Sequence, residues 1–544
     1  MPSRYTRFTR IALLVASGVL FSSLGALAQS EVKLDRLTIA LPPTETESNH
    51  FWLGTPGNYQ QHEPMLETLI GNDPVTNAPV PRLAKSWEYS DDFLVWTFYL
   101  QEGVPFHFGY GEFTARDVVH TLDLLARPDA PPGGLWQSGL RETEVLDDYT
   151  IRFHFDTPLL PQEGENMFSQ ASARSTLYIT SKAQWDATGL EGMEREIAGT
   201  GPFRFKSRGL GTNLVLERIE DHWRGDNPQF RELEMRWVPE QATRLAMLLS
   251  GEAQMAFLGR ELSDDAVNAG MGLVTADLEN MQVALLMTGN WFVDGFEPQH
   301  DPSNPLIDPL VRRALNHAVD QQEIREVIYS DRASPLYSWG WRPEHIGWDP
   351  TFPERFEELY AYDPEKARDL LAQAGYGEGE LKLTIEGFPL PGQPEIPDLV
   401  DALHMYFTNV GIDATIRDAD SWGAFRSRRD QGLAHGSVYI MRNTPIRLTG
   451  EFITGSYSTD GWAFLYLDEY LEEQNRSFNA TSDVEERDRI AREVGNYVFE
   501  LHTHVPLAST FVEVAVDPRV VSGWTWPAQS PTILTHWYMI DIVD

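Results

Sequence analysis

Strand-like and helix-like segments alternate along most of this chain, and this alternation limits its fold to the α/β class. Thr150–Asp156 (TIRFHFD) alternates apolar and polar side chains, which is typical of a half-buried strand. Residues 113–125 repeat apolar side chains at helical spacing behind a Thr114 cap, and Asp308–Pro309 begins another helix. No single linker divides the chain. The sequence therefore predicts an α/β protein whose domains exchange segments of chain.

Composition excludes several kinds of site. The chain has no cysteine, which rules out disulfides, thiolate zinc sites, iron–sulfur clusters and cysteine nucleophiles. Its 43 basic and 81 acidic residues give a formal charge of −38, so we expect no broad basic surface for nucleic acid. A length of 544 residues is sufficient for about two to four domains.

The first 28 residues have the pattern of a secretory signal peptide. MPSRYTRFTR carries three arginines and no acid, an apolar run follows, and small residues end it at Ala26 and Ala28. We expect cleavage after Ala28 and export to the periplasm, without a lipid anchor because no cysteine can carry one. The alternative is an uncleaved anchor helix, since about eighteen apolar residues can just span a bilayer.

Motifs of catalysis and metal binding are missing from the sequence. It contains no G-x-S-x-G nucleophile elbow, no H-E-x-x-H helix and no P-loop. His502 and His504 can both project from one strand face, but without a third ligand an ordinary strand is the better interpretation. No segment isolates two acids in an apolar setting, as a glycosidase site would. We therefore expect no cofactor, no metal and no enzymatic activity, although paired carboxylates among the 81 acids stay open at this point.

Tryptophans gather in a few loops rich in Gly, Ser and Asp. These loops include SWGW with Trp339, DSW with Trp422 and DGW with Trp462. Such clusters either line ligand pockets or form satellite core beneath long loops, and both interpretations remain open here. Arg442, in the apolar run SVYIMRNTPIRL, either reaches a ligand or belongs to a surface ion pair.

Four segments, in order, resemble the family 5 extracellular solute-binding proteins, which are the oligopeptide, dipeptide and nickel receptors of ABC importers. The first contains PRLAKSWEYSDDFLVWTFYL, the second contains GTGPF and HWRGD, and the last two contain capped helices. The segments are Pro81–Leu125, Gly199–Ala256, Pro305–Ile324 and Asp363–Tyr376. Together they span most of the chain after residue 28.

The resemblance implies a two-lobed periplasmic binding protein of the large type, in which lobe II is inserted into lobe I. It places the signal peptide at 1–28, lobe I at 29–283 and 506–544, and lobe II at 284–505. The chain then crosses between the lobes near Gln282–Leu286 and Val505–Leu507. The implied function is capture of a small solute in the interlobe cleft by a monomer, which delivers it to the permease subunits of an ABC importer.

The ligand depends on a region where this chain departs from the family pattern. In the peptide-binding members a pocket tryptophan precedes a strand that ends in an aspartate, and Trp422 corresponds to that tryptophan. No acid occurs between Asp430 and Glu451, so nothing there pairs with the α-ammonium group of a peptide. Tryptophans suit a sugar and an arginine suits an anion, so oligopeptide and oligosaccharide both remain open. The expected ligand contacts are Trp339, Trp422, Tyr439, Arg442 and Trp462.

Two functions of other classes are also compatible with the sequence. One is a secreted hydrolase of peptides or sugars, which would turn its bound oligomer over. The other is a periplasmic chaperone or sensor, which would present its ligand to a membrane receptor. We expect simple retention of an intact solute instead.

Overall fold

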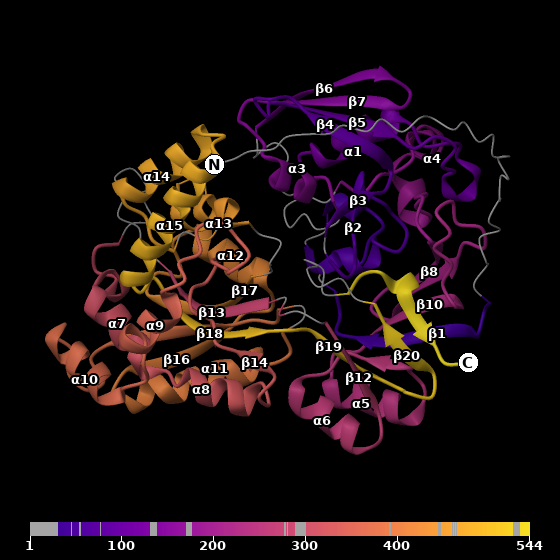
Figure 1. Cartoon of the computed structure of the whole chain (residues 1–544). Helices are drawn as coiled ribbons and strands as arrows, with labels where there is room; N and C mark the ends of the chain where they lie inside the picture. Colours follow the sequence, from indigo (N-terminus) through magenta and orange to yellow (C-terminus); the bar gives the residue numbers. More distant parts are fainter. Residues whose placement is uncertain are drawn as a thin grey trace, which may run out of the picture.

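The computed structural model describes residues 31–544, except 45, 54–55, 77, 131–138, 170–176, 277–278, 280, 289–300, 391–392, 444–447, 460, 462, 464 and 526–533. The expected signal peptide, residues 1–28, lies outside the described part. Figure 1 shows two α/β lobes side by side, with the chain passing from the first to the second and back. No helix in the described part is long and apolar enough to cross a membrane.

A mixed seven-stranded sheet forms the base of lobe I. Its strands are β1 (Leu34–Leu41), β8 (Phe203–Gly209), β9 (Asn213–Arg218), β10 (Phe230–Trp237), β11 (Met255–Ala256), β12 (Gly272–Thr275) and β19 (Glu513–Val516). Their order is β12-β19-β11-β1-β10-β9-β8, with β1 parallel to β10 and β11. The helices α5 (Gln241–Ser250) and α6 (Arg260–Asn268) pack against β11 and β12 respectively. The strand β19 therefore brings the end of the chain into the N-terminal lobe.

A smaller four-stranded antiparallel sheet forms the other part of lobe I. Its strands, in spatial order, are β4 (Ala84–Tyr89), β5 (Val95–Leu100), β7 (Thr150–Phe155) and β6 (Leu140–Asp147). The remaining elements of lobe I are α1 (Ala115–Leu125), α3 (Pro161–Met167), α4 (Lys182–Arg195), β2 (Ile70–Asn72), β3 (Pro79–Pro81), β20 (Val521–Trp524), β21 (Ile540–Ile542) and short 3-10 turns at Phe51–Leu53, Pro56–Gln61, His107–Gly109 and Trp537–Met539. The predicted strand at Thr150–Asp156 is confirmed, with alternate side chains in the core.

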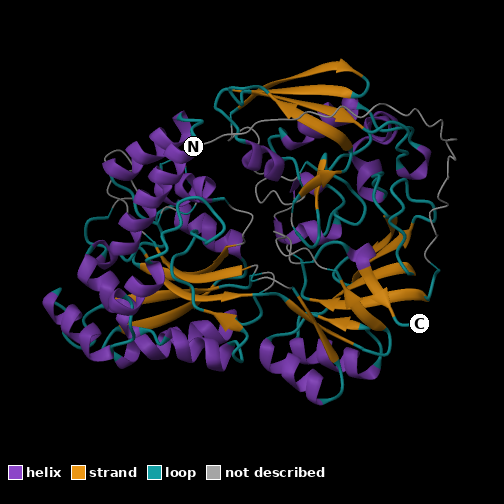
Figure 2. Cartoon of the chain, viewed as in Figure 1, coloured by secondary structure: helices purple, strands orange, loops and turns teal. Residues whose placement is uncertain are grey.

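Lobe II is built on a six-stranded mixed sheet flanked by helices (Figure 2). The strand order is β14 (Ala333–Ser334), β18 (His504–Thr510), β13 (Met281–Met287), β17 (Ser437–Asn443), β15 (Lys382–Gly387) and β16 (Asp413–Asp418). The helical elements are α7 (Pro309–Ala318), α8 (Gln321–Glu323), α9 (Phe352–Leu359), α10 (Pro364–Gln373), α11 (Ile396–Asn409), α12 (Trp422–Asp430), α13 (Thr449–Tyr457), α14 (Glu469–Ala480), α15 (Val484–Glu500), the 3-10 turn Pro305–Ile307 and the π turn Ile324–Ile328.

The predicted helix starts are confirmed by their cap hydrogen bonds. Asp308 accepts from the Leu310 backbone N–H before α7, and Asp363 accepts from the Lys366 N–H before α10. A capping box at Thr114 begins α1. Each cap satisfies amide groups that the first helical turn leaves without partners, which is why short polar side chains mark these positions in the sequence.

Two neighbouring strands carry the chain between the lobes. β13 and β18 pair antiparallel in lobe II, from Met281 opposite Thr510 to Leu286 opposite His504. Only two residues separate the end of β18 from the start of β19 in lobe I. Each lobe has its own hydrophobic core. Lobe II is therefore an insertion into lobe I, and two short connections take the place of a linker.

A buried ion cluster joins the lobes beside these connections. Arg260 on α6 pairs with Glu513 on β19, and its Nη2 donates to Thr510 Oγ1 at 2.9 Å. Arg332 of lobe II donates from Nε to the same Glu513 carboxylate at 3.0 Å. Its Nη1 donates to Asp264 of α6 at 2.7 Å. Glu513 therefore holds one guanidinium from each lobe.

The turn that leads into this cluster has an unusual backbone. Ser330 and Asp331 have positive φ angles of 50° and 58°, and they follow the π turn Ile324–Ile328. A left-handed conformation costs a non-glycine residue about 1 kcal/mol or more. The Ser330 hydroxyl donates to Asp264 at 3.0 Å, so a hydrogen bond between the lobes helps to offset this cost.

Glu395, the residue before α11, makes this cluster sensitive to pH. Burial raises the pKa of Glu395 to about 7, although the Arg260 guanidinium, with Nε 3.8 Å from the carboxylate, opposes the shift. The folded-state pKa thus lies above the ordinary value of 4.5, so folding becomes less favourable as pH rises between these two values.

The variant Glu395→Gln lacks this titration and should respond differently to pH. We compare the free energy of unfolding of the variant with that of the wild type. From pH 5 to pH 8 this difference should shift in favour of the variant by roughly 2–3 kcal/mol. Urea unfolding curves of both proteins at the two pH values measure the change. Parallel pH profiles for the two proteins would contradict the assignment.

Candidate functional site

Trp422 and Tyr439, two of the predicted ligand contacts, belong to one aromatic cluster in lobe II. The ring of Trp422, at the start of α12, lies 5.9 Å from that of Tyr439 on β17 and 5.7 Å from that of Phe425. Phe388, which directly follows β15, lies 5.5 Å from Trp422. Tyr439 is fully buried, whereas Trp422 is partly exposed. The cluster thus presents Trp422 at the surface and supports it from below.

The acid beneath this cluster is already neutralised. Glu386, at 0% exposure, accepts two hydrogen bonds from Arg428 at 3.0 and 3.1 Å. It also accepts from Arg417 at 3.3 Å and from the Ser437 hydroxyl at 3.0 Å. A carboxylate held in this way has little capacity left for a ligand ammonium group. The argument that no acid here pairs with a peptide ammonium group remains a prediction.

Arg442 lies on β17 opposite Val283 of β13 and is partly buried. This position sets it beside one of the two connecting strands. Trp462 and residues 444–447 lie outside the described residues. The roles of Arg442 and Trp462 as ligand contacts remain predictions.

Trp339 lies in the core of lobe II, at 0% exposure. Its ring meets Phe452 edge-on, with the ring centres 4.4 Å apart. The backbone N–H of Trp339 donates to His504 Nε2 at 3.1 Å, and burial lowers the pKa of His504 to about 3, which keeps this nitrogen free to accept. In this arrangement Trp339 is a packing residue, and its contact with a ligand remains a prediction.

The segment 338–342, which we call the tryptophan loop, is tied to both connecting strands. On β18, His504 accepts the hydrogen bond from the Trp339 backbone N–H near the start of the loop. On β13, the Gln282 amide accepts from the Gly340 N–H at 2.9 Å and donates to the Trp341 carbonyl at 3.1 Å. Gly340 has φ +96°, and a Cβ there would overlap the ring of Phe452. Only glycine allows the loop to approach Phe452 so closely.

Arg342, at the end of the tryptophan loop, was missed in the sequence. It is 5% exposed, and its Nε and Nη2 are buried without a hydrogen-bond partner. The one signal in the sequence is an arginine within the apolar, tryptophan-rich stretch SWGWRP. Buried unpaired charge is expensive, so a group of this kind marks a place where a ligand can contribute the missing partner.

The lobes touch again at a second place. Arg487 on α15 of lobe II donates from Nη1 to Glu163 on α3 of lobe I at 2.6 Å. In Figure 1 these helices lie toward the top, whereas the connecting strands lie lower. Arg487 is 2% exposed and also donates to the Thr481 carbonyl at 2.7 Å. The two residues are 324 positions apart in the sequence and belong to different lobes, so the contact joins lobe I to lobe II directly.

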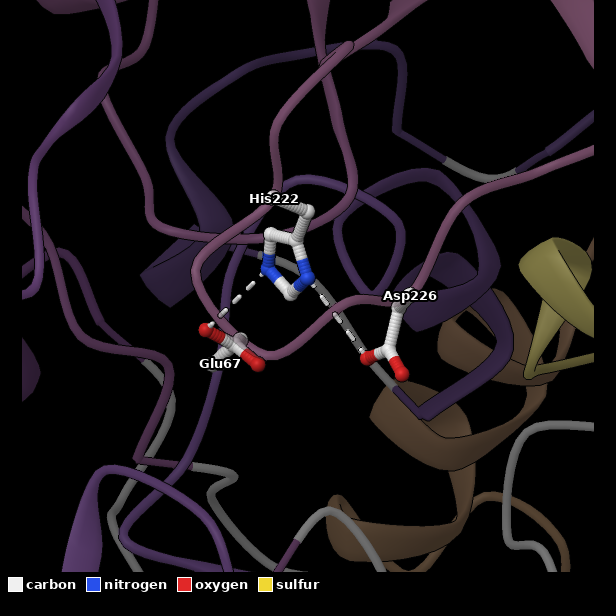
Figure 3. Close-up of side chains that lie close together, drawn as sticks. All are labelled: Glu67, His222 and Asp226. Atoms are coloured by element: carbon white, nitrogen blue, oxygen red, sulfur yellow. Dashed lines mark ion pairs between the residues drawn. The ribbon is translucent and has the colours of Figure 1, made fainter. Parts of the chain in front are cut away.

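Glu67, His222 and Asp226 form the clearest candidate for a metal centre in the described residues (Figure 3). The imidazole lies between the carboxylates, with Nε2 3.9 Å from Glu67 and Nδ1 3.7 Å from Asp226. Arg224, however, is ion-paired with both acids, 3.3 Å from Glu67. His222 Nε2 lies 2.9 Å from the Thr200 carbonyl, to which it donates. The guanidinium occupies the place of a cation, and the group is a structural ion cluster.

An open surface groove of about 670 Å³ lies over α14 and α15. Its rim includes Tyr470 and Tyr497, whose rings are 4.7 Å apart. Arg489 and Arg492 in the groove are paired with acids of their own helix. Trp339, Trp422, Tyr439 and Arg442, the predicted ligand contacts that the structure describes, do not line it.

Comparison with known proteins supports a binding role. The family model for bacterial extracellular solute-binding proteins, family 5 Middle, matches residues 78–451. The glutathione-binding protein GsiB of Salmonella paratyphi A is 23% identical over 461 residues, which cover 82% of this chain and 83% of that protein. Di/tripeptide-binding protein 1 of Pseudomonas aeruginosa is 27% identical over 385 residues, which cover 66% of this chain and 67% of that protein.

A solved structure shows the same fold. The periplasmic binding protein DppA from Helicobacter pylori, in complex with the peptide STSA, superposes with a TM-score of 0.76 at 23% identity. The match covers 93% of this chain and 98% of that one. The predicted two-lobed periplasmic binding protein fold, with lobe II inserted into lobe I, is thereby confirmed.

Proposed function

Because the chain belongs to the bacterial extracellular solute-binding proteins of family 5, we propose that it closes its two lobes over a small polar solute and delivers it to an ABC importer. The observation that carries this proposal is the arrangement of the contacts between the lobes. The ion cluster around Glu513 lies beside the connecting strands, and the Arg487–Glu163 pair lies on other elements. Separation of that pair allows rotation about the connections, which is how hinged binding proteins admit and enclose a ligand.

The proposal includes lobe boundaries at 29–283, 284–505 and 506–544. The two hydrophobic cores support it, since buried residues from Val283 to Ala508 form one core and residues on either side form the other. We further propose that the signal peptide is removed after Ala28, that no lipid is attached, and that the protein works as a monomer without enzymatic activity. Proteins of this family bind solutes outside the cytoplasmic membrane, which suits export by such a signal.

The proposed ligand is a short oligopeptide or an oligosaccharide. The names of the relatives favour peptides, since one binds glutathione and another binds di- and tripeptides. Trp422 supports either class, because an indole stacks on a sugar face as well as on an apolar side chain. Trp422 and Arg442 are the proposed direct contacts. Tyr439 and Trp339 are buried and are proposed to contribute to the same site, as is Trp462, which lies outside the described residues.

A thermal-shift assay in high salt tests the function and the ligand class together. We expect a pool of tri- to pentapeptides to raise the unfolding temperature more than an oligosaccharide pool does. Ligand at about a hundred times its Kd adds about 2.7 kcal/mol to the folded state. Mass spectrometry of the eluted ligand should show it intact. A response to neither pool, or a hydrolysed ligand, would contradict the proposal.

Trp422→Ala should weaken the binding of the ligand identified in this way. Trp422 packs on Phe388, Phe425 and Tyr439 and is also partly exposed, so we expect at least a tenfold rise in Kd together with a lower unfolding temperature. Trp348→Ala is the matched control, because Trp348 is also a half-buried tryptophan of lobe II but packs against Phe352. Titration calorimetry measures both. An affinity within twofold of wild type would remove Trp422 from the site.

Glu163→Gln should make the closed form less stable. The amide can still accept from the Leu160 N–H, which Glu163 caps at 3.1 Å, but it no longer neutralises Arg487. We expect faster ligand dissociation and a several-fold loss of affinity, measured by stopped-flow fluorescence. Glu165→Gln on the same helix is the control, since Glu165 contacts Trp87 within lobe I. Equal dissociation rates in the two variants would argue against closure at this contact.

A further inference from the structure

Arg342 presents one complete edge of its guanidinium group without a partner. The two nitrogens that lack hydrogen bonds are Nε and Nη2, and both are shielded from solvent. These two N–H groups point in parallel from the same edge of the planar group. A carboxylate binds to that edge with both oxygens at once, which is the strongest and most directional way in which arginine recognises an anion.

Each of the other buried arginines of the described residues makes at least one hydrogen bond or ion pair, although some, such as Arg260 at Nε, also have a nitrogen without a hydrogen bond. Arg312 donates to three backbone carbonyls, those of Leu306, Ile307 and Leu501. Arg244 likewise donates to backbone carbonyls, and Arg487 has Glu163. Arg342 alone among them makes neither kind of contact with the protein.

The charge on Arg342 persists at neutral pH. Burial lowers the pKa of its guanidinium to about 10, and the nearest acids, Glu344 and Glu279, favour the charged form. Neither acid comes within ion-pair distance of Arg342 in the described structure. A cation without a partner in such a place costs several kcal/mol, which an anion bound at the open edge would offset.

The position of Arg342 connects it to the hinge. The tryptophan loop that carries it is held by Gln282 on β13 and by His504 on β18. Asn443, at the end of β17, donates to the same Gln282 amide at 3.4 Å and has a buried Oδ1 without a partner. Unsatisfied polar groups therefore gather where the strands from lobe I enter lobe II.

We propose that the Nε–Nη2 edge of Arg342 binds a carboxylate of the transported solute. This inference rests on the proposed function, because it assigns the anionic end of that solute to the junction of the lobes. The edge is covered in this arrangement, so the carboxylate enters while the lobes are apart and is enclosed as they close.

The first test uses acetate, the smallest carboxylate, and does not depend on knowing the solute. Sodium acetate, compared with sodium chloride at equal ionic strength, should raise the unfolding temperature of the wild type in a saturable way. Arg342→Met keeps the apolar stem and removes the charge, so the two salts should act alike on it. Arg325→Met, at another half-buried arginine of lobe II, should keep the response to acetate.

The second test uses two peptide pools that differ only at the C-terminus. The wild type should bind tri- to pentapeptides with a free carboxylate at least tenfold more tightly than the same peptides as amides, and Arg342→Met should bind both equally. Two results for the wild-type protein would overturn the inference. One is an equal response to acetate and to chloride, and the other is equal affinity for the peptides with a free carboxylate and for their amides.

The ligand-free variant adds a third readout. Arg342→Met should unfold at the same temperature as the wild type or higher, because it removes an unpaired buried charge. A clearly lower temperature would show that ordered water or the fold itself satisfies the guanidinium, and would also overturn the inference. Failure of both peptide and sugar pools to bind counts against the proposed function, while the acetate comparison still decides the role of Arg342.

Discussion

The relative position of the two lobes depends on the carboxylate of Glu513. It accepts from Arg332 of lobe II and pairs with Arg260 of lobe I, and both partners are also bonded to the chain on the other side of the junction. Pairing stabilises a buried guanidinium, so loss of the Glu513 carboxylate would destabilise both arginines at once. The cluster therefore holds the two lobes together beside the connecting strands.

The buried arginines then fall into two groups with different purposes. Arg260 and Arg487 are ion-paired within the protein, the first beside the connecting strands and the second where α15 meets α3. Arg342 lies on a loop tied to those same strands but has no partner. In the proposed function, a solute that supplies this partner would bind to a loop that is hydrogen-bonded to the connecting strands.

Local patterns in the sequence predicted the local structure well. The caps at Asp308 and Asp363, the strand at Thr150–Asp156 and the inserted second lobe are present as expected. The meeting of Trp422 and Tyr439 follows from a helix and a strand that are close in sequence. The ion clusters could not be predicted, because their partners lie far apart in the chain, 68 residues for Arg332 and Asp264 and 324 for Arg487 and Glu163, and no periodicity links them. The burial of Trp339 was likewise not evident from the sequence, because its contacts with Phe452 and His504 come from residues more than 100 positions away.

The place of β19 in its sheet affects how the protein is made. This strand comes from residues 513–516, yet it lies between β11 and β12, which are completed before residue 276. Until the last part of the chain is available, those two strands have no neighbour to join them. The main sheet of lobe I cannot be completed during synthesis, and the nascent protein stays unfinished until almost all of it has been made. Export by the proposed signal peptide would benefit from that delay, because a chain crosses a membrane more readily before it folds.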